Sequence, residues 1–160
     1  MADFLSKISI RPLGKQEEVP YKLLLLADPN QEVIDAYLKN SSIYIAVLAD
    51  ETVGVFVLFP LSDERVEIKN IAVAEPHQDK GIGKILLSEA IRIAQQHHYQ
   101  SIWIGTANSS IAQLYLYQKM GFEIMEIKKD FFLQNYPDPI FENGIQAKHL
   151  LLLSQALSYH

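Results

Sequence analysis

The chain has 160 residues, of which 49% are hydrophobic and 21% charged, and this length and composition predict one ordered globular domain spanning residues 1–160. The formal net charge of −5 argues against a nucleic-acid partner, because contact with a phosphate backbone requires a basic surface. The sequence contains no cysteine, which excludes disulfides, thiolate nucleophiles and cysteine-containing zinc sites and fits a reducing compartment.

The first half of the chain predicts strands and two helices. Alternating polar and apolar residues predict a strand over Lys7–Leu13, and helical spacing predicts helices around Glu17–Ala27 and Gln31–Lys39. Two runs rich in β-branched and aromatic residues flank a short polar turn and predict a hairpin. The strands predicted in this region are Ile43–Leu48, Val53–Phe59 and, after a polar turn, Val66–Val73.

From Gly81 onward, helical and strand patterns alternate. The predicted helices are Gly81–His98 and Ser109–Met120, the second closed by Gly121, and the predicted strands are Ser101–Thr106, Phe122–Ile127 and the run "HLLLL" from His149. The stretch Tyr136–Gly144 contains two prolines and is expected to be irregular. This order indicates a mixed α/β fold with an antiparallel front half.

Nothing in the sequence resembles a membrane anchor or a targeting segment. The chain starts without a basic region followed by a long apolar one, and the apolar runs Leu23–Ala27 and Leu150–Leu153 are far too short to span a bilayer. We therefore expect a soluble, cytoplasmic protein.

The stretch "HQDKGIGKIL", residues 77–86, places two glycines one residue apart where a strand passes into a helix. A Walker phosphate loop would need other residues at Gln78 and Ile85, and a dinucleotide-binding fingerprint would need a small residue at Leu86. Glycine lets a ligand approach the backbone, and the first turn of a helix offers unpaired N–H groups to a pyrophosphate. Taken alone, however, the two glycines are explained more simply by turn geometry at a helix start.

The context of these glycines resembles the acyl-CoA signature of the GNAT superfamily of N-acetyltransferases. In "IAVAEPHQDKGIGKILL", Gln78, Gly81 and Gly83 lie in the register of the family's Gln/Arg-x-x-Gly-x-Gly/Ala pattern, after a strand ending in an "IAV" run. A second segment, "LYLYQKMGF" (residues 114–122), is similar to the family's Leu-Tyr-x-Lys-x-Gly-Phe segment. The resemblance extends from about Ile8 to Phe132, and no family motif matches the chain beyond it.

The resemblance implies a mixed, mostly antiparallel sheet of six or seven strands with flanking helices. Two strands of the family, here Val66–Val73 and Ser101–Thr106, splay apart so that pantetheine lies between them like an added strand. The acetyl-CoA contacts that the resemblance implies are Ile71, Ala72, Val73, Gln78, Asp79, Lys80, Gly81, Ile82, Gly83, Lys84 and Asn108. For Lys80 and Lys84 the alternative is a solvated lysine at a helix start, and for Asn108 it is a helix cap.

The implied reaction is direct transfer of an acetyl group from acetyl-CoA to a primary amine, without a covalent enzyme intermediate. The amine must be neutral to attack, and the leaving thiolate is expelled more easily if it is protonated. Tyr117 matches the family's tyrosine and is expected to be the acid, whereas Tyr115 lies about 200° away around the helix and cannot face the same site. Glu67 resembles a glutamate that some members carry on this strand and is the candidate base; deprotonation through water, or a surface salt bridge at Glu67, is the alternative.

The acceptor is expected to be a small-molecule or peptide amine, which the sequence does not identify. The segments expected to contact it are Glu17–Lys39, the Ser62–Arg65 turn and the loop "NYPDPIFENG", where Asp138 and Glu142 could attract a cation or serve solubility. A non-catalytic module that binds or senses acyl-CoA is the alternative function. No metal, nucleic acid or membrane is expected as a partner, and a homodimer stays open.

Overall fold

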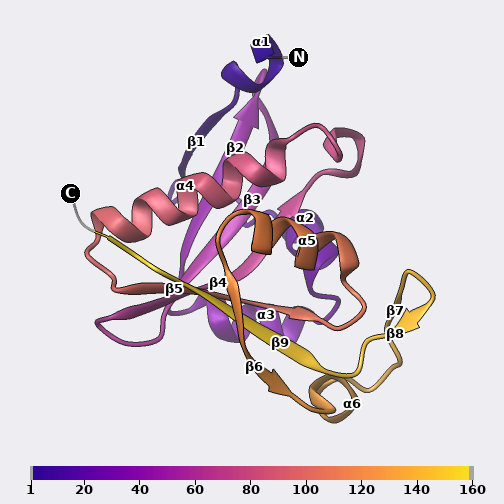
Figure 1. Cartoon of the computed structure of the whole chain (residues 1–160). Coiled ribbons are helices and arrows are strands. Elements are labelled where there is room, and N and C mark those ends of the chain that lie inside the picture. The colour runs from indigo at the N-terminus through magenta and orange to yellow at the C-terminus, as the bar shows by residue number, and fades with distance from the viewer. Residues whose placement is uncertain (1, 159–160) are drawn as a thin grey trace.

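Seven strands form one mixed sheet in the order β1-β2-β3-β4-β5-β9-β6 (Figure 1). The structure is a computed structural model that describes residues 2–158. The strands are β1 (Ser9–Pro12), β2 (Ser42–Leu48), β3 (Glu51–Pro60), β4 (Arg65–Val73), β5 (Ser101–Ala107), β6 (Glu123–Lys128) and β9 (Leu150–Ala156). Neighbouring strands are antiparallel except β4 and β5, which are parallel. The mixed, mostly antiparallel sheet expected from the sequence is therefore confirmed.

Helices cover both faces of this sheet. They are α1 (Ala2–Ser6), α2 (Tyr21–Ala27), α3 (Gln31–Leu38), α4 (Ile82–Gln96), α5 (Ile111–Lys119) and α6 (Phe131–Asn135), with a 3₁₀ turn, η1, at Glu75–His77. In Figure 1, α4 and α5 lie in front of the sheet and α2 and α3 behind it. Among residues 2–158, no helix combines the length and apolar character needed to cross a bilayer.

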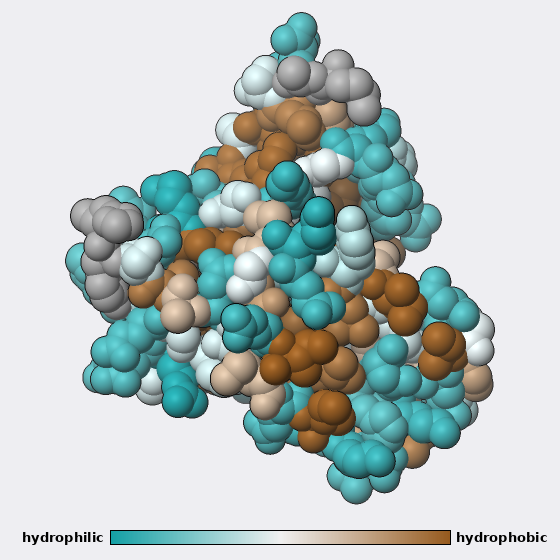
Figure 2. Space-filling view, viewed as in Figure 1, coloured by the Kyte–Doolittle hydropathy of each residue, from teal (hydrophilic) through white to brown (hydrophobic). Residues whose placement is uncertain are grey.

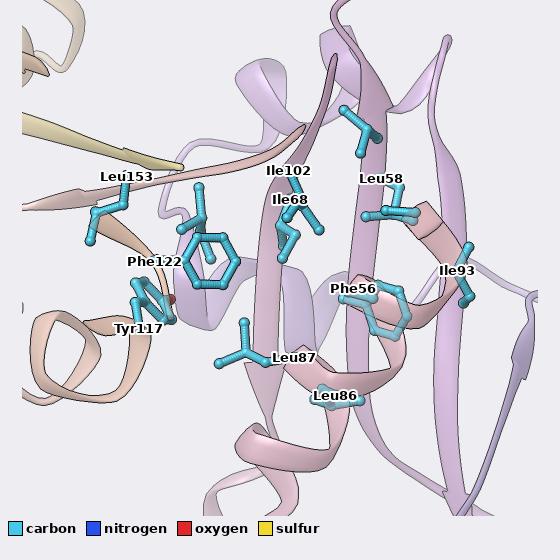
Figure 3. Packing of buried hydrophobic residues seen from close by; sticks show 14 of the residues in the cluster. Phe56, Leu58, Ile68, Leu86, Leu87, Ile93, Ile102, Tyr117, Phe122 and Leu153 are labelled. Atoms are coloured by element: carbon cyan, nitrogen blue, oxygen red, sulfur yellow. The ribbon is translucent and has the colours of Figure 1, made fainter. Parts of the chain in front are cut away.

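Two buried clusters, one on each face, hold the layers together. Leu86 and Leu87 of α4 pack against Phe56 of β3 in the first cluster (Figure 3). Leu24 of α2 packs with Val55 of the same strand in the second. A strand covered on both faces must be apolar on both, which explains why β3 is a nearly continuous apolar run.

The helix predicted around Glu17–Ala27 begins only at Tyr21. The Glu17 carboxylate instead accepts hydrogen bonds from the backbone N–H of Gly14 (2.7 Å) and from the Arg11 guanidinium (3.0 Å to Nη2). These bonds hold residues 14–17 in a turn. Apart from such differences at their ends, the other predicted strands and helices are present.

The segment Tyr136–Gly144, expected to be irregular, leads instead into a short hairpin. Its strands, β7 (Phe141–Glu142) and β8 (Ile145–Gln146), pair antiparallel. Asn143 and Gly144 between them have φ of 55° and 73°, as a two-residue hairpin turn requires. The Asn-Gly pair was the sequence signal for this hairpin, and the prolines restrict only the residues before it. Helices α1 and α6 were not predicted either.

Strands β4 and β5 separate partway along their length. Their last paired residues are Ile68 and Ile104, although β4 continues to Val73 and β5 to Ala107. Just beyond that point β4 carries a β-bulge against β3, with Lys69 as its extra residue. A bulge bends its strand, so β4 turns away from β5 and leaves an open gap. The splaying of these two strands that the sequence implied is present.

Candidate functional site

Two cavities in the described part of the chain meet at the gap between β4 and β5. The larger cavity, of about 540 Å³, lies between the end of β4 and the start of α4. The smaller cavity, of about 270 Å³, lies on the side of α3 and α6. Both are lined by Leu26, Ala27, Ile71, Gln113 and Tyr117. Because these residues line both, the two cavities are adjacent.

The larger cavity is surrounded by the segments that the sequence assigned to a cofactor. Every predicted cofactor residue lines it except Lys80 and Asn108. The predicted residues that do so are Ile71, Ala72, Val73, Gln78, Asp79, Gly81, Ile82, Gly83 and Lys84. No side chain of the described residues caps α4, so the N–H groups of its first turn remain available to an anion.

The two glycines of this loop have different reasons to be glycine. Gly81 has φ of +91°, a left-handed conformation that L side chains rarely adopt, so it meets the needs of the turn. Gly83 has no such constraint, and a methyl group there would lie 3.8 Å from Leu116 Cδ2, an ordinary van der Waals contact. The packing of the protein itself does not require glycine at this position. The missing side chain leaves space beside Gly83 in the larger cavity, which this residue lines.

Gln78 and the two lysines of the loop are held differently. Gln78 Nε2 donates to the carbonyl oxygen of Val73 at 2.9 Å, which closes the loop against the end of β4. Lys80 Nζ lies over the Phe4 ring of α1, 5.7 Å from its centroid. Lys84 lines the larger cavity. Of the two lysines, Lys84 is therefore better placed for a phosphate.

Asn108 ties β5 to the segment that precedes β9. Its Nδ2 donates to Gln146 O at 3.1 Å, and its Oδ1 accepts from the N–H groups of Lys148 (2.8 Å) and His149 (2.9 Å). The capping alternative is wrong, because Ser110 is the N-cap residue of α5 and caps it without a side-chain hydrogen bond. Asn108 lines neither cavity, so contact with the cofactor stays a prediction while its hydrogen bonds are structural.

Tyr117 of α5 lies where the two cavities meet. Its side chain is only 5% exposed and packs beside Phe122, with 6.2 Å between ring centroids (Figure 3). Tyr115 is 65% exposed, so the two tyrosines face opposite ways, as helical geometry predicts. Burial, with a smaller contribution from the negative charge of Glu142, raises the pKa of Tyr117. The phenol therefore remains protonated at neutral and moderately alkaline pH.

Strand β4 presents Glu67 and Asn70 to the smaller cavity. Glu67 Oε2 lies 3.2 Å from Lys69 Nζ, and the Glu67 side chain is 15% exposed. Asn70 is buried and donates from Nδ2 to Leu24 O (2.9 Å) and to the Tyr37 hydroxyl (3.0 Å). Within residues 2–158 its Oδ1 is buried without a hydrogen-bond partner. Sequence reasoning missed Asn70, although a polar residue at a buried position of a strand was the available signal.

The loop between α2 and α3 meets the segment after α6 at Asp28. Its carboxylate accepts hydrogen bonds from the Tyr136 hydroxyl and from the backbone N–H of Asn30, both at 3.1 Å. Burial raises the pKa of Asp28. The Tyr136 ring packs against Phe132, with 5.5 Å between centroids, so aromatic rings form one wall of the smaller cavity.

Glu142 of β7 completes the wall of the smaller cavity. Its Oε1 accepts a hydrogen bond from Ser110 Oγ at 2.8 Å. Asp138, the other acidic residue of this segment, is exposed and does not line the cavity. The Ser62–Arg65 turn, which was also expected to contact an acceptor, lines neither cavity.

Comparison with known proteins agrees with this geometry. Residues 11–122 match the model of the acetyltransferase (GNAT) family. An uncharacterized N-acetyltransferase of Bacillus subtilis (strain 168), YvbK, is 50% identical over 149 residues, which are 93% of this chain and 96% of that protein. A GNAT family acetyltransferase from Elizabethkingia anophelis with acetyl-CoA bound has a TM-score of 0.93 at 50% identity, covering 94% of this chain and 99% of that one. A Bacillus subtilis acetyltransferase in complex with CoA has a TM-score of 0.89 at 46% identity, covering 95% and 100%.

Proposed function

This chain belongs to the acetyltransferase (GNAT) family, and from that premise we propose that it transfers an acetyl group from acetyl-CoA directly to a primary amine, without a covalent enzyme intermediate. The larger cavity takes acetyl-CoA and the smaller cavity takes the amine. The observation that carries the proposal is the junction of the two cavities at Tyr117, because the thioester and the amine must meet there.

The placement of acetyl-CoA is supported by three features of the larger cavity. Beyond Ile68, the edge of β4 that faces β5 pairs with no strand of residues 2–158, which leaves backbone groups for the pantetheine amides. The uncapped first turn of α4 offers its N–H groups and positive dipole end to the pyrophosphate. The space beside Gly83 lets these phosphates approach the backbone. The Elizabethkingia anophelis neighbour, which has acetyl-CoA bound, shares this fold closely.

The reaction replaces a carbon–sulfur bond by a carbon–nitrogen bond and needs two proton transfers. The neutral amine nitrogen attacks the thioester carbon, the carbon–sulfur bond breaks, and the nitrogen loses a proton. Tyr117 gives its phenolic proton to the departing sulfur, a role for which burial keeps the phenol protonated. Glu67, which lines the smaller cavity, accepts the proton of the amine directly or through a water molecule.

The test is acetyl-CoA binding by isothermal titration together with thiol release in a panel of primary amines. We expect saturable binding and amine-dependent release of CoA, with one acetyl group on the product amine by mass spectrometry. Binding without release in any amine would contradict the transfer reaction. That outcome would leave a module that binds acyl-CoA without turning it over.

A further inference from the structure

The smaller cavity contains features that bear on which amine it accepts. We propose that Glu142 binds the ammonium group of the incoming acceptor and that the site selects small primary amines with an apolar or aromatic remainder and no carboxylate of their own. This inference rests on the proposed function, since it assigns the acceptor to the smaller cavity.

Glu142 is held in place with one oxygen left open. Oε1 accepts the hydrogen bond of Ser110 Oγ at 2.8 Å, and within residues 2–158 Oε2 has no hydrogen-bond donor. The neighbouring Asn143 donates from Nδ2 to Ser109 O at 2.9 Å, which fastens the β7–β8 hairpin to the start of α5. A fixed carboxylate with a free oxygen, on a residue that lines a cavity, is suited to receive a charged N–H group.

Glu142 also lies close to the place where acetyl transfer must occur. It lines the smaller cavity together with Tyr117, which lines both cavities. After burial, its negative charge is the second cause of the raised pKa of Tyr117. An ammonium group bound to Oε2 is therefore held in a cavity that Tyr117 also lines. It gives one proton to water to become the neutral amine that attacks, and Glu67 takes the second proton as the amide forms.

The remaining lining residues explain the exclusion of carboxylates. Among the described residues that line the smaller cavity, Asp28, Glu67 and Glu142 are acidic and Lys69 is the one cation. Lys69 is already paired with Glu67 at 3.2 Å. A carboxylate on the acceptor would therefore meet acidic side chains without an unpaired cation.

The apolar part of the acceptor has a wall to contact. Phe131, Phe132 and Tyr136 line the smaller cavity, with Phe131 and Phe132 in edge-to-face contact at 5.2 Å between centroids. Figure 2 shows the apolar side chains that gather over β6 and the β7–β8 hairpin, on the outer surface of the same region. The rings of α6 turn a second apolar surface inward, toward the acceptor.

The experiment compares tyramine with tyrosine, which differ only by the carboxylate. Thiol release with saturating acetyl-CoA is measured for the wild type, for Glu142→Gln and for the control Asp138→Asn. For the wild type, kcat/KM should be higher for tyramine than for tyrosine by roughly tenfold or more. Glu142→Gln keeps the side-chain size but loses the charge, so kcat/KM for tyramine should fall roughly ten- to a hundredfold, mainly through KM. Asp138→Asn removes an exposed charge of the same segment and should leave the preference unchanged.

A binding measurement keeps the two hypotheses separate. Tyramine and tyrosine are titrated into the CoA-saturated wild type and into Glu142→Gln. If the wild type binds tyramine more tightly than tyrosine and this preference weakens in Glu142→Gln, the inference is supported even if no amine is acetylated. A lack of acetylation would refute only the transfer reaction. Equal use or binding of the two compounds, no binding of either, or an unchanged preference in Glu142→Gln would overturn the inference.

Discussion

Replacing Tyr117 by phenylalanine removes one hydroxyl group from the junction of the two cavities. The ring stays in its packing beside Phe122. Burial and the charge of Glu142 raise the pKa of the phenol, and no hydrogen bond from the described residues contributes to that shift. The free energy of unfolding should therefore change by no more than about 1 kcal/mol. Because the variant stays folded, a fall in kcat would then report on the chemical step.

The size of that rate change follows from the environment of the phenol. General acids typically contribute about 10²- to 10⁴-fold, which is roughly 3 to 5 kcal/mol of barrier. Burial raises the pKa of Tyr117, whereas an ordinary thiol has a pKa of about 8.5. Proton transfer to the departing sulfur is therefore uphill, and we expect kcat to fall by about 10²-fold, at the lower end of the range.

The assay is thiol release at saturating acetyl-CoA with any accepted amine, and Tyr115→Phe is the matched control. Tyr115 is 65% exposed, and its contact is with Lys119 Nζ, 5.9 Å from the ring centroid, which phenylalanine preserves. Its kcat should stay within about twofold of the wild type, as for most exposed substitutions. Acetyl-CoA affinity, measured by isothermal titration, should be unchanged in both variants. Equal effects of the two substitutions on kcat, or a matching loss of affinity in Tyr117→Phe, would refute the assignment of the acid.

Other substitutions probe the cofactor loop, the base and an exposed ion pair. Gly83→Ala adds a methyl group 3.8 Å from Leu116. The free energy of unfolding should stay the same or rise by up to about 1 kcal/mol, which a melting curve detects. Acetyl-CoA binding in isothermal titration should nevertheless weaken. Unchanged affinity would mean that the glycine serves only the helix start. Glu67→Gln should lower turnover with acetyl-CoA affinity kept, and a wild-type turnover rate would contradict its role as base. The bond to Arg11 lowers the pKa of Glu17 from 4.5 to about 2, so its contribution to stability is present above the unfolded pKa and is lost as the pH falls toward 2. The difference in melting temperature between the wild type and Glu17→Gln should accordingly shrink over that range, and a difference independent of pH would exclude this linkage.

Local patterns in the sequence were enough for most elements of the fold. The alternation in β4 and the helical stripe of α4 depend on residues within a few positions of one another, so their type could be read directly. The opposite faces of Tyr115 and Tyr117 follow from the geometry of a single helix in the same way. Element ends were less predictable. Helix α2 begins at Tyr21, directly after Pro20 at its N-cap, although the spacing of apolar residues extends back to Glu17.

The walls of the smaller cavity were decided only by tertiary structure. Asp28 and Tyr136 are 108 residues apart in sequence, and Ser110 and Glu142 are 32 apart, yet each pair is joined by a hydrogen bond. Asp138 and Glu142 lie in the same loop and could not be told apart in the sequence, because a carboxylate in a polar segment has the same local pattern whether it faces water or a cavity. Folding of the hairpin against the start of α5 buries one of them partly and leaves the other in solvent. Which side chains share a site depends on how distant segments pack together, and local periodicity does not encode that packing.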